Sequence, residues 1–225
     1  APWLQSFASE WPNILFIAVD DLRLQSSRFG QEQMVTPGLE RLASQGVTFT
    51  RAYVSVPVCG ASRASLLSGV RPTSDRFWDY KTRKDVDLPD VPSLPKWFKE
   101  HGYTTISNGK IYHHKDDDLD AWSEAPWMPE HQGVGWKCYL KPESIAMIEA
   151  NKSIADPDSN MGPSTEDADV PDNMYPDGML ADKVIEDLKR FAESGEPFFL
   201  SAGFWKPHLP FNAPKKYWDL YDPEE

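Results

Sequence analysis

Cysteine is scarce in this chain, whose 225 residues include only Cys59 and Cys138. Two thiols could form one disulfide, but their separation matches no paired zinc-ligand spacing. The composition therefore indicates neither a disulfide-rich scaffold nor a zinc ribbon.

Positive charge is scarce as well. The 23 Lys and Arg residues are outnumbered by 35 Asp and Glu residues, which leaves a net charge of −12, and no block of basic residues offsets it. Because such a chain repels phosphate backbones, the sequence predicts no nucleic-acid partner.

Long apolar runs are missing too. The longest, Ile14–Val19, is far shorter than the roughly 20 residues that a helix needs to cross a bilayer, so no membrane span is expected. Residues 1–13 lack a starting Met and the basic and apolar segments of a signal peptide. We therefore expect a presequence that was either removed or never cloned.

Segments with strand and helix patterns alternate along the chain. Ile14–Val19 is an unbroken apolar run, which is typical of a parallel strand covered on both faces. A helix follows over 36–46, with Thr36 as N-cap and Gly46 as C-cap, and then a β-rich run over 47–54. The remaining predicted elements are a helix over 93–102 with Leu94, Trp97 and Phe98 facing inward, a strand over 103–110, a helix over 178–195 and a strand over 197–204. This order predicts an α/β fold with a mainly parallel central sheet flanked by helices.

The alternation lapses between about residues 113 and 176, where Asp, Pro, Trp and Gly dominate and one helix is expected over 142–151. Structureless stretches of this length are usually functional or disordered, and Trp122, Trp127 and Trp136 favour an ordered segment that covers the surface.

Charged and imidazole side chains follow three of the predicted strands. Asp20 and Asp21 come directly after the first strand, and their mutual repulsion favours a hard divalent cation between them. The alternative is a solvated strand end in which Asp21 caps a turn. Ligand sites in open α/β sheets lie at the carboxyl ends of strands. Lys110, His113 and the neighbouring His114 follow the second such strand, and Lys206 and His208 follow the third, so these groups are expected to converge on one sheet edge.

Cys59 precedes Arg63 by four residues, in a segment expected to join the same edge. The thiol could be an inert core cysteine, a thiolate nucleophile activated by a nearby base, or the precursor of another group. The residues alone leave these three interpretations open.

The stretch CGASRASLLSG, residues 59–69, resembles the C-x-[PA]-S-R-x-x-L-[LT]-[TS]-G signature of type I sulfatases, which belong to the alkaline phosphatase superfamily. NILFIAVDDLR, GYTTISNGKIYHH, DVPDNMYPDG and GFWKPHLPF extend the resemblance over nearly the whole chain, and it is strongest to iduronate-2-sulfatase-like enzymes. Ala61 stands where many sulfatases have proline.

The resemblance implies an alkaline phosphatase-like fold of which residues 1–225 form the N-terminal part, with a long irregular excursion at about 113–176. A sulfatase normally carries a later Asp-His-Gly or Asp-Asn segment that completes the metal site, together with a further lysine of the site. Nothing after Pro207 matches that segment. A C-terminal segment or chain of the same enzyme is therefore an expected partner.

In this family the cysteine is oxidised to formylglycine, whose hydrate is the nucleophile. The resemblance implies this conversion for Cys59, carried out by a formylglycine-generating or an anaerobic maturation enzyme. It further implies that Asp20, Asp21 and the converted Cys59 bind Ca²⁺, with Mg²⁺ as the other candidate, and that Arg63 holds the diol. Lys110 and Lys206 are implied to bind substrate. His113 is implied to bind sulfate or take the diol proton, and His208 to bind substrate and protonate the leaving oxygen.

The implied activity is hydrolysis of a sulfate ester in a carbohydrate, with a 2-O-sulfated uronic acid of a polysaccharide such as a glycosaminoglycan as the candidate. The alternatives are a phosphomonoester or phosphonate hydrolase of the same superfamily and a non-catalytic carbohydrate-binding relative that keeps the thiol. The expected location is secreted, periplasmic or lysosomal.

Overall fold

A computed structural model describes residues 11–23, 25–26, 29–31, 33–130, 135–154 and 161–222. These residues form two compact units. Unit 1 comprises the chain up to residue 18, residues 55–128 and residues 180–204, and unit 2 comprises residues 19–54, 129–179 and 205–225. That the whole of 1–225 is one part of a single catalytic domain stays a prediction.

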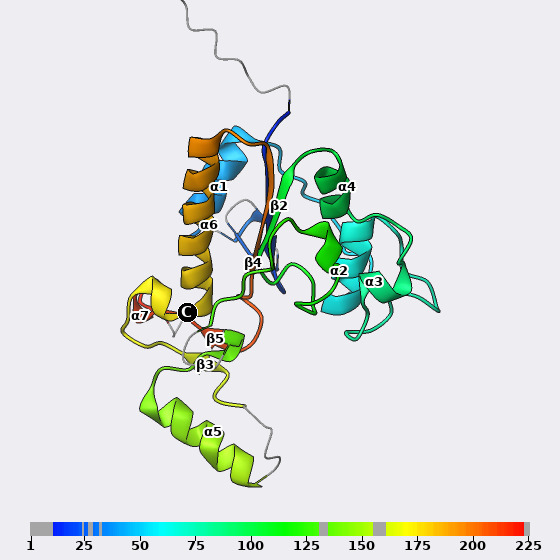
Figure 1. The fold of residues 1–225 in the computed structure, drawn as a ribbon. Helices are drawn as coiled ribbons and strands as arrows, with labels where there is room; N and C mark the ends of the chain where they lie inside the picture. Colours follow the sequence, from blue (N-terminus) through cyan, green and yellow to red (C-terminus); the bar gives the residue numbers. More distant parts are fainter. Residues whose placement is uncertain are drawn as a thin grey trace, which may run out of the picture. The chain divides into compact units, whose positions relative to one another are not determined.

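A three-stranded sheet forms the centre of unit 1. Its strands are β1 (Ile14–Val19), β2 (Thr104–Gly109) and β4 (Phe198–Phe204), in the order β1-β4-β2. β2 and β4 run parallel, and Gly109 lies beside Gly203. The helices α2 (Cys59–Ser68), α3 (Lys84–Asp87) and α4 (Leu94–Glu100) lie on one side of the sheet, and α6 (Pro176–Ser194) lies on the other (Figure 1). The predicted α/β class is confirmed.

Each face of β4 is buried against helices. On one face, Phe199 belongs to a cluster with Leu67 of α2, and its ring stacks on that of Phe98 of α4 at 4.9 Å between centroids. On the other face, Phe198 stacks on Phe191 of α6 at 4.7 Å. Burial of such large apolar side chains supplies most of the stabilisation of a small sheet, about 1.5–3 kcal/mol for each one.

Two packing expectations were wrong. The described residues cover one face of β1 only: Ile14 and Phe16 pack against the core cluster of unit 1, whereas Leu15 and Ile17 are 43% and 50% exposed. In α4, Phe98 is the inward anchor, whereas Leu94 and Trp97 are exposed. The indole of Trp97 instead stacks on the ring of His101 at 4.1 Å.

Unit 2 has little regular sheet. Its elements are α1 (Pro37–Gln45), the 3-10 turn η3 (Gly135–Lys137), α5 (Pro142–Ile154), β3 (Thr165–Glu166), the 3-10 turn η4 (Asp172–Met174), β5 (Phe211–Asn212) and α7 (Lys215–Trp218). β3 pairs in parallel with β5. The buried Glu166 ties these pieces together, since its carboxylate accepts bonds from the Leu140 and Lys141 amides and from the Tyr175 hydroxyl.

The helix expected over 36–46 is α1, although Thr36 makes no side-chain capping bond. The strand expected over 47–54 was wrong, because this segment has no regular structure and Tyr53 is 88% exposed. A high content of β-forming residues does not make a strand without a partner strand to pair with.

The excursion over 113–176 is largely ordered where it is described. It contains the 3-10 turn η2 (Leu119–Ala121) and α5, which confirms the helix expected over 142–151, while residues 131–134 and 155–160 lie outside the described residues. Trp122 is buried in the core of unit 1. None of the helices formed by the described residues combines the length and apolar character that a membrane crossing requires.

Candidate active site

Cys59 is the first residue of α2, and its position is set by close packing behind it. A side chain at Gly60 would place a Cβ 2.4 Å from the carbonyl oxygen of Tyr80, so only glycine fits there. Ala61 and Ala64 are buried against Phe77 on the same side of the helix. The run of small residues therefore seats the start of α2 tightly, and neither Cys59 nor Cys138 is in a disulfide.

An imidazole lies against the thiol. The Sγ atom of Cys59 is 3.1 Å from Nδ1 of His113, which belongs to the segment that follows β2. The ring of His113 also meets the ring of Tyr80 edge-on at 6.1 Å. This contact joins residues 54 positions apart, which the sequence could not place together.

Arg63 lies one helical turn after Cys59 and is buried. Its Nη1 donates to the carbonyl oxygen of Ile111 at 2.8 Å and to that of Lys110. The amide of Lys110 in turn donates to the carbonyl of Gly203 at 2.8 Å. The guanidinium thus fixes the chain where it leaves β2, and the structure brings Cys59, Arg63, Lys110 and His113 together in unit 1.

Asp20 and Asp21 belong to unit 2 and differ in environment. Asp20 is 5% exposed, whereas Asp21 is exposed and adopts a left-handed backbone with a φ of 54°. Asp177, in the first turn of α6, is a third carboxylate of this unit. Its carboxylate accepts bonds from the amides of Trp205 and Lys206 at 2.9 and 2.8 Å. Burial raises the pKa of Asp177, and the charge of Asp20 raises it further.

A hard divalent cation fits this donor chemistry, because positive charge stabilises a buried carboxylate whose pKa is raised by burial and by a neighbouring carboxylate. Within the described ranges, no three His, Cys, Asp or Glu side chains are grouped closely enough to hold a metal ion. Asp177 was missed by the sequence analysis, and the signal available for it was an acidic residue directly before the helix predicted over 178–195.

Lys206 and His208 lie in the turn that follows β4, within unit 2. The Nζ atom of Lys206 donates to the carbonyl oxygens of His208, at 3.2 Å, and of Pro210. Nδ1 of His208 lies 2.7 Å from the carbonyl oxygen of Leu209. Because a carbonyl only accepts, Nδ1 carries the proton and Nε2 is the nitrogen left to exchange a proton with substrate.

A family model for sulfatases matches residues 12–223. The chain belongs to the sulfatase family. The human iduronate 2-sulfatase is 33% identical over 219 residues, which are 93% of this chain and 37% of that protein. This sulfatase chain therefore spans about two fifths of the length of that curated relative.

Solved structures show the same fold. The protein Ps i-CgsB, in complex with k-i-k-neocarrahexaose, matches with a TM-score of 0.61 and 22% identity over 89% of this chain and 46% of its own. The phosphonate monoester hydrolase of Agrobacterium radiobacter matches with a TM-score of 0.58 and 20% identity over 95% of this chain and 44% of its own. The resemblance to sulfatases is confirmed.

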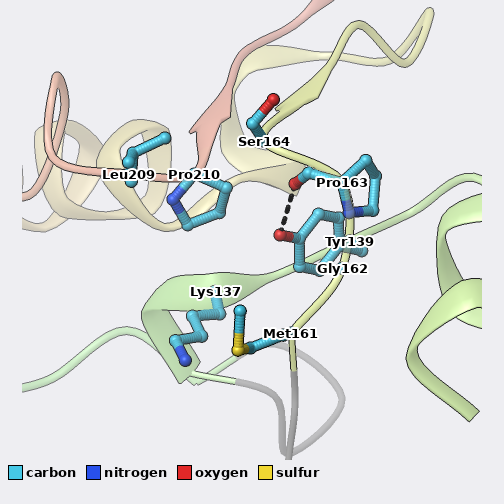
Figure 2. A pocket seen from close by; sticks show the side chains of 8 residues that line it. All are labelled: Lys137, Tyr139, Met161, Gly162, Pro163, Ser164, Leu209 and Pro210. Atoms are coloured by element: carbon cyan, nitrogen blue, oxygen red, sulfur yellow. Dashed lines mark hydrogen bonds between the residues drawn. The ribbon is translucent and has the colours of Figure 1, made fainter. Parts of the chain in front are cut away.

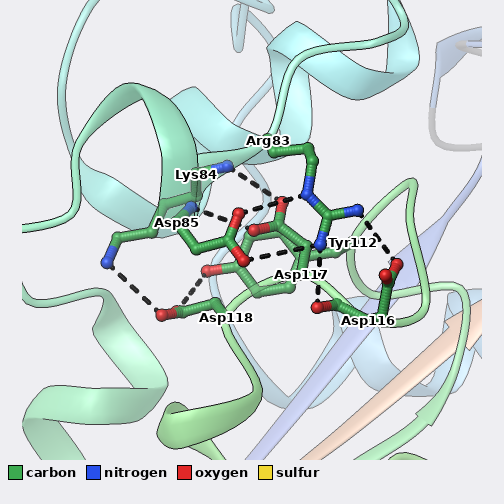
Figure 3. A network of polar contacts seen from close by, with 7 residues as sticks. All are labelled: Arg83, Lys84, Asp85, Tyr112, Asp116, Asp117 and Asp118. Carbon is green, nitrogen blue, oxygen red and sulfur yellow. Dashed lines mark hydrogen bonds and ion pairs between the residues drawn. The ribbon is translucent and has the colours of Figure 1, made fainter.

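A polar network anchors the chain just after His113 (Figure 3). The carboxylate of Asp117 accepts bonds from the amides of Lys84 and Asp85, at 2.9 and 3.0 Å, where α3 begins. Asp118 pairs with the buried ammonium of Lys84 at 3.3 Å and accepts the hydroxyl of Tyr112 at 2.8 Å. The segment that carries His113 is thereby attached to α3, which packs against α2.

Asp117 makes the folded state sensitive to pH. Burial raises the pKa of its carboxyl from 3.8 to about 6. The folded chain therefore binds this proton more tightly than the unfolded chain, and the resulting stabilisation is lost as the pH rises from about 4 to about 6. Asp117→Asn is expected to remove this part of the slope of unfolding free energy against pH, measured by urea denaturation across that range.

The truncation Asp117→Ala leaves two amides of α3 without their acceptor, so it is expected to lower the unfolding free energy by about 2–3 kcal/mol. The matched control is Asp90→Ala, which removes an exposed carboxylate of unit 1 and should change the free energy by less than about 0.5 kcal/mol. Equal effects of the two truncations would contradict the anchoring role of Asp117.

Proposed function

We propose that this chain is part of a sulfuric ester hydrolase that removes sulfate from a sulfated carbohydrate. The observation that carries the proposal is the placement of Cys59, at the head of a helix with the family signature, 3.1 Å from His113 and one turn from the buried Arg63. A 2-O-sulfated uronic acid of a polysaccharide is the substrate that we propose. The name of the human relative, iduronate 2-sulfatase, supports this choice.

The proposed nucleophile is a formylglycine made from Cys59. A maturation enzyme, with dioxygen (aerobic) or a radical cofactor (anaerobic) as the two-electron oxidant, oxidises the Cβ–Sγ group to a thioaldehyde. Water then replaces the sulfur, which leaves as H₂S, to give the aldehyde, and a second water adds to give a geminal diol. One diol oxygen attacks the ester sulfur and the bond to the sugar oxygen breaks. The second hydroxyl then loses its proton, the carbonyl re-forms and sulfate is expelled, which an ordinary serine could not achieve.

The neighbouring residues have distinct proposed roles. Lys110 offsets the charge of the sulfuryl group as the transition state forms. The imidazole of His113 accepts the diol proton that is lost when the aldehyde re-forms. Arg63 holds the diol. Its bonds to the carbonyls of Lys110 and Ile111 also keep the segment that carries Lys110 and His113 in position.

His208 is the proposed proton donor to the sugar oxygen: as the imidazolium it gives up the proton on Nε2 and keeps the proton on Nδ1. Its Nδ1–H bond to Leu209 sets the tautomer, and Lys206 braces the same turn through the carbonyls of His208 and Pro210. The lysine charge is also proposed to attract the anionic substrate.

Asp20, Asp21 and the converted Cys59 are the proposed ligands of Ca²⁺, with Mg²⁺ as the other candidate. The ion would supply Lewis-acid chemistry that favours the ionised diol. Further ligands are proposed to come from a C-terminal segment or chain of the same enzyme. Secreted, periplasmic and lysosomal compartments are the proposed locations, since sulfated polysaccharides occur there.

The rival function is hydrolysis of phosphate or phosphonate monoesters, favoured by the fold that this chain shares with a phosphonate monoester hydrolase. The test compares kcat/KM of the full-length, matured protein on 4-nitrophenyl sulfate, 4-nitrophenyl phosphate and a phenylphosphonate monoester. We expect the sulfate to be preferred by at least about tenfold. A preference for either phosphorus ester would reject the sulfatase proposal, and no hydrolysis of any ester by protein with an unmodified Cys59 would favour a carbohydrate-binding relative.

A further inference from the structure

Trp136 lies among positively charged and imidazole groups of unit 2. Its ring meets that of His208 edge-on, with 4.9 Å between centroids and an interplanar angle of 88°. The ammonium groups of Lys137 and Lys206 lie 5.3 and 5.8 Å from the centre of the same ring. Two lysines and an imidazole therefore surround one indole ring. Such a local concentration of basic side chains is unusual in a chain with a net charge of −12.

A cavity of about 360 Å³ opens beside this group (Figure 2). Its wall includes Lys137, Tyr139, Met161, Pro163, Leu209 and Pro210. Leu209 and Pro210 directly follow His208 in the chain, so the cavity is built onto the turn that carries the proposed proton donor.

One wall of the cavity is held rigidly. The hydroxyl of Tyr139 donates to the carbonyl oxygen of Pro163 at 2.7 Å. Gly162 lies flat on the tyrosine ring, since a Cβ at that position would come 2.7 Å from Cζ. Figure 2 shows Lys137 on the opposite side of the cavity from Pro163 and Ser164. The space therefore offers apolar and aromatic walls with a cation at one side.

We propose that Trp136, Lys137 and this cavity bind a second, acidic sugar, the neighbour of the sugar whose sulfate ester is cleaved. This inference rests on the proposed function. Pyranose rings present flat C–H faces that pack on aromatic and apolar side chains, and the volume lies within the range of about 300–1,000 Å³ typical of small-molecule sites. The ammonium of Lys137 selects a sugar that bears a carboxylate or sulfate. Without such a local positive charge, the net negative charge of this chain would repel an acidic polysaccharide.

The test measures affinities in full-length protein that carries Cys59→Ala, so that the probes are not consumed. The probes are the monosaccharide 2-O-sulfated uronate and a heparin-derived disaccharide that ends in the same sugar, studied by titration calorimetry. We expect the disaccharide to bind at least about tenfold more tightly. Trp136→Ala and Lys137→Met should each reduce this ratio to near one, and Lys137→Arg should keep most of it. Lys137→Met should also weaken the salt dependence of disaccharide binding.

Two matched controls remove the same side-chain types elsewhere. Trp78→Ala removes an exposed indole of unit 1, and Lys152→Met removes a lysine of α5 that pairs with Glu149. Both should leave the ratio of the two affinities unchanged. Equal affinity of the two probes, absence of binding by both, or equal losses for both probes in the Trp136 and Lys137 variants would overturn the subsite.

Sulfate release by protein with an intact Cys59 is measured separately. If no sulfate ester is hydrolysed but the Trp136 and Lys137 variants still remove the preference for the disaccharide, the proposed function fails and the subsite stands. If sulfate is released and the preference is absent, the function stands and the subsite fails.

Discussion

Cys59→Ala is expected to abolish sulfate release, lowering kcat by at least about 10⁴-fold, because alanine can form neither an aldehyde nor a diol. The measurement is the initial rate on 4-nitrophenyl sulfate by full-length protein from a host that matures such cysteines. The control is Cys138→Ala. This second thiol is buried in the core of unit 2, with its sulfur 3.8 Å from the carbonyl oxygen of Met174, and kcat should stay within about twofold. A Cys59→Ala protein with unchanged activity would contradict the proposed nucleophile.

The contact between Cys59 and His113 also suits a thiolate nucleophile, and loss of activity in Cys59→Ala does not separate the two chemistries. The mass of the peptide that contains residue 59 does. Conversion to the aldehyde lowers this mass by the difference between H₂S and an oxygen atom, and the aldehyde reacts with hydrazides and not with maleimides. Active protein whose Cys59 has an unchanged mass and reacts with maleimide would establish the thiolate instead.

The elements that could be predicted are those whose signals are local. The apolar-rich run over 197–204 predicts β4 to within one residue, and the pattern from Thr36 to Gly46 predicts α1 equally closely. The same locality explains the errors. Whether Leu15 and Ile17 are covered depends on what packs over β1, and no window of sequence around them contains that information.

The site could be predicted in part for the same reason. Lys110 was expected to lie at the end of β2, and the parallel register of β2 with β4 puts it there. The approach of His113 to Cys59 depends on the path of the chain after β2, which is set by bonds to Arg63 and by the anchor at Asp117. Buried polar groups far apart in sequence find their partners only in the folded chain, so neither anchor has a local signal.

His208→Ala is expected to lower kcat on a sugar sulfate by about 10²–10⁴-fold, because a sugar alkoxide is a poor leaving group unless it is protonated. On 4-nitrophenyl sulfate the loss should be much smaller, since 4-nitrophenolate leaves at neutral pH without a proton. The unequal loss on the two substrates distinguishes proton donation from a structural role, which would lower both rates alike.

Two further variants define what His208 contributes. His208→Gln keeps a polar side chain in the turn but cannot deliver a proton, so its loss on the sugar sulfate should match that of His208→Ala. His101→Ala removes an exposed imidazole whose Nδ1 lies 2.7 Å from the carbonyl oxygen of Trp97, and it should leave both rates unchanged. Recovery of activity in His208→Gln would show that the imidazole only braces its turn. The proton donor would then have to be another group. Nδ1 is engaged by the carbonyl of Leu209, so donation by His208 itself requires Nε2 of an imidazole ring, which glutamine lacks.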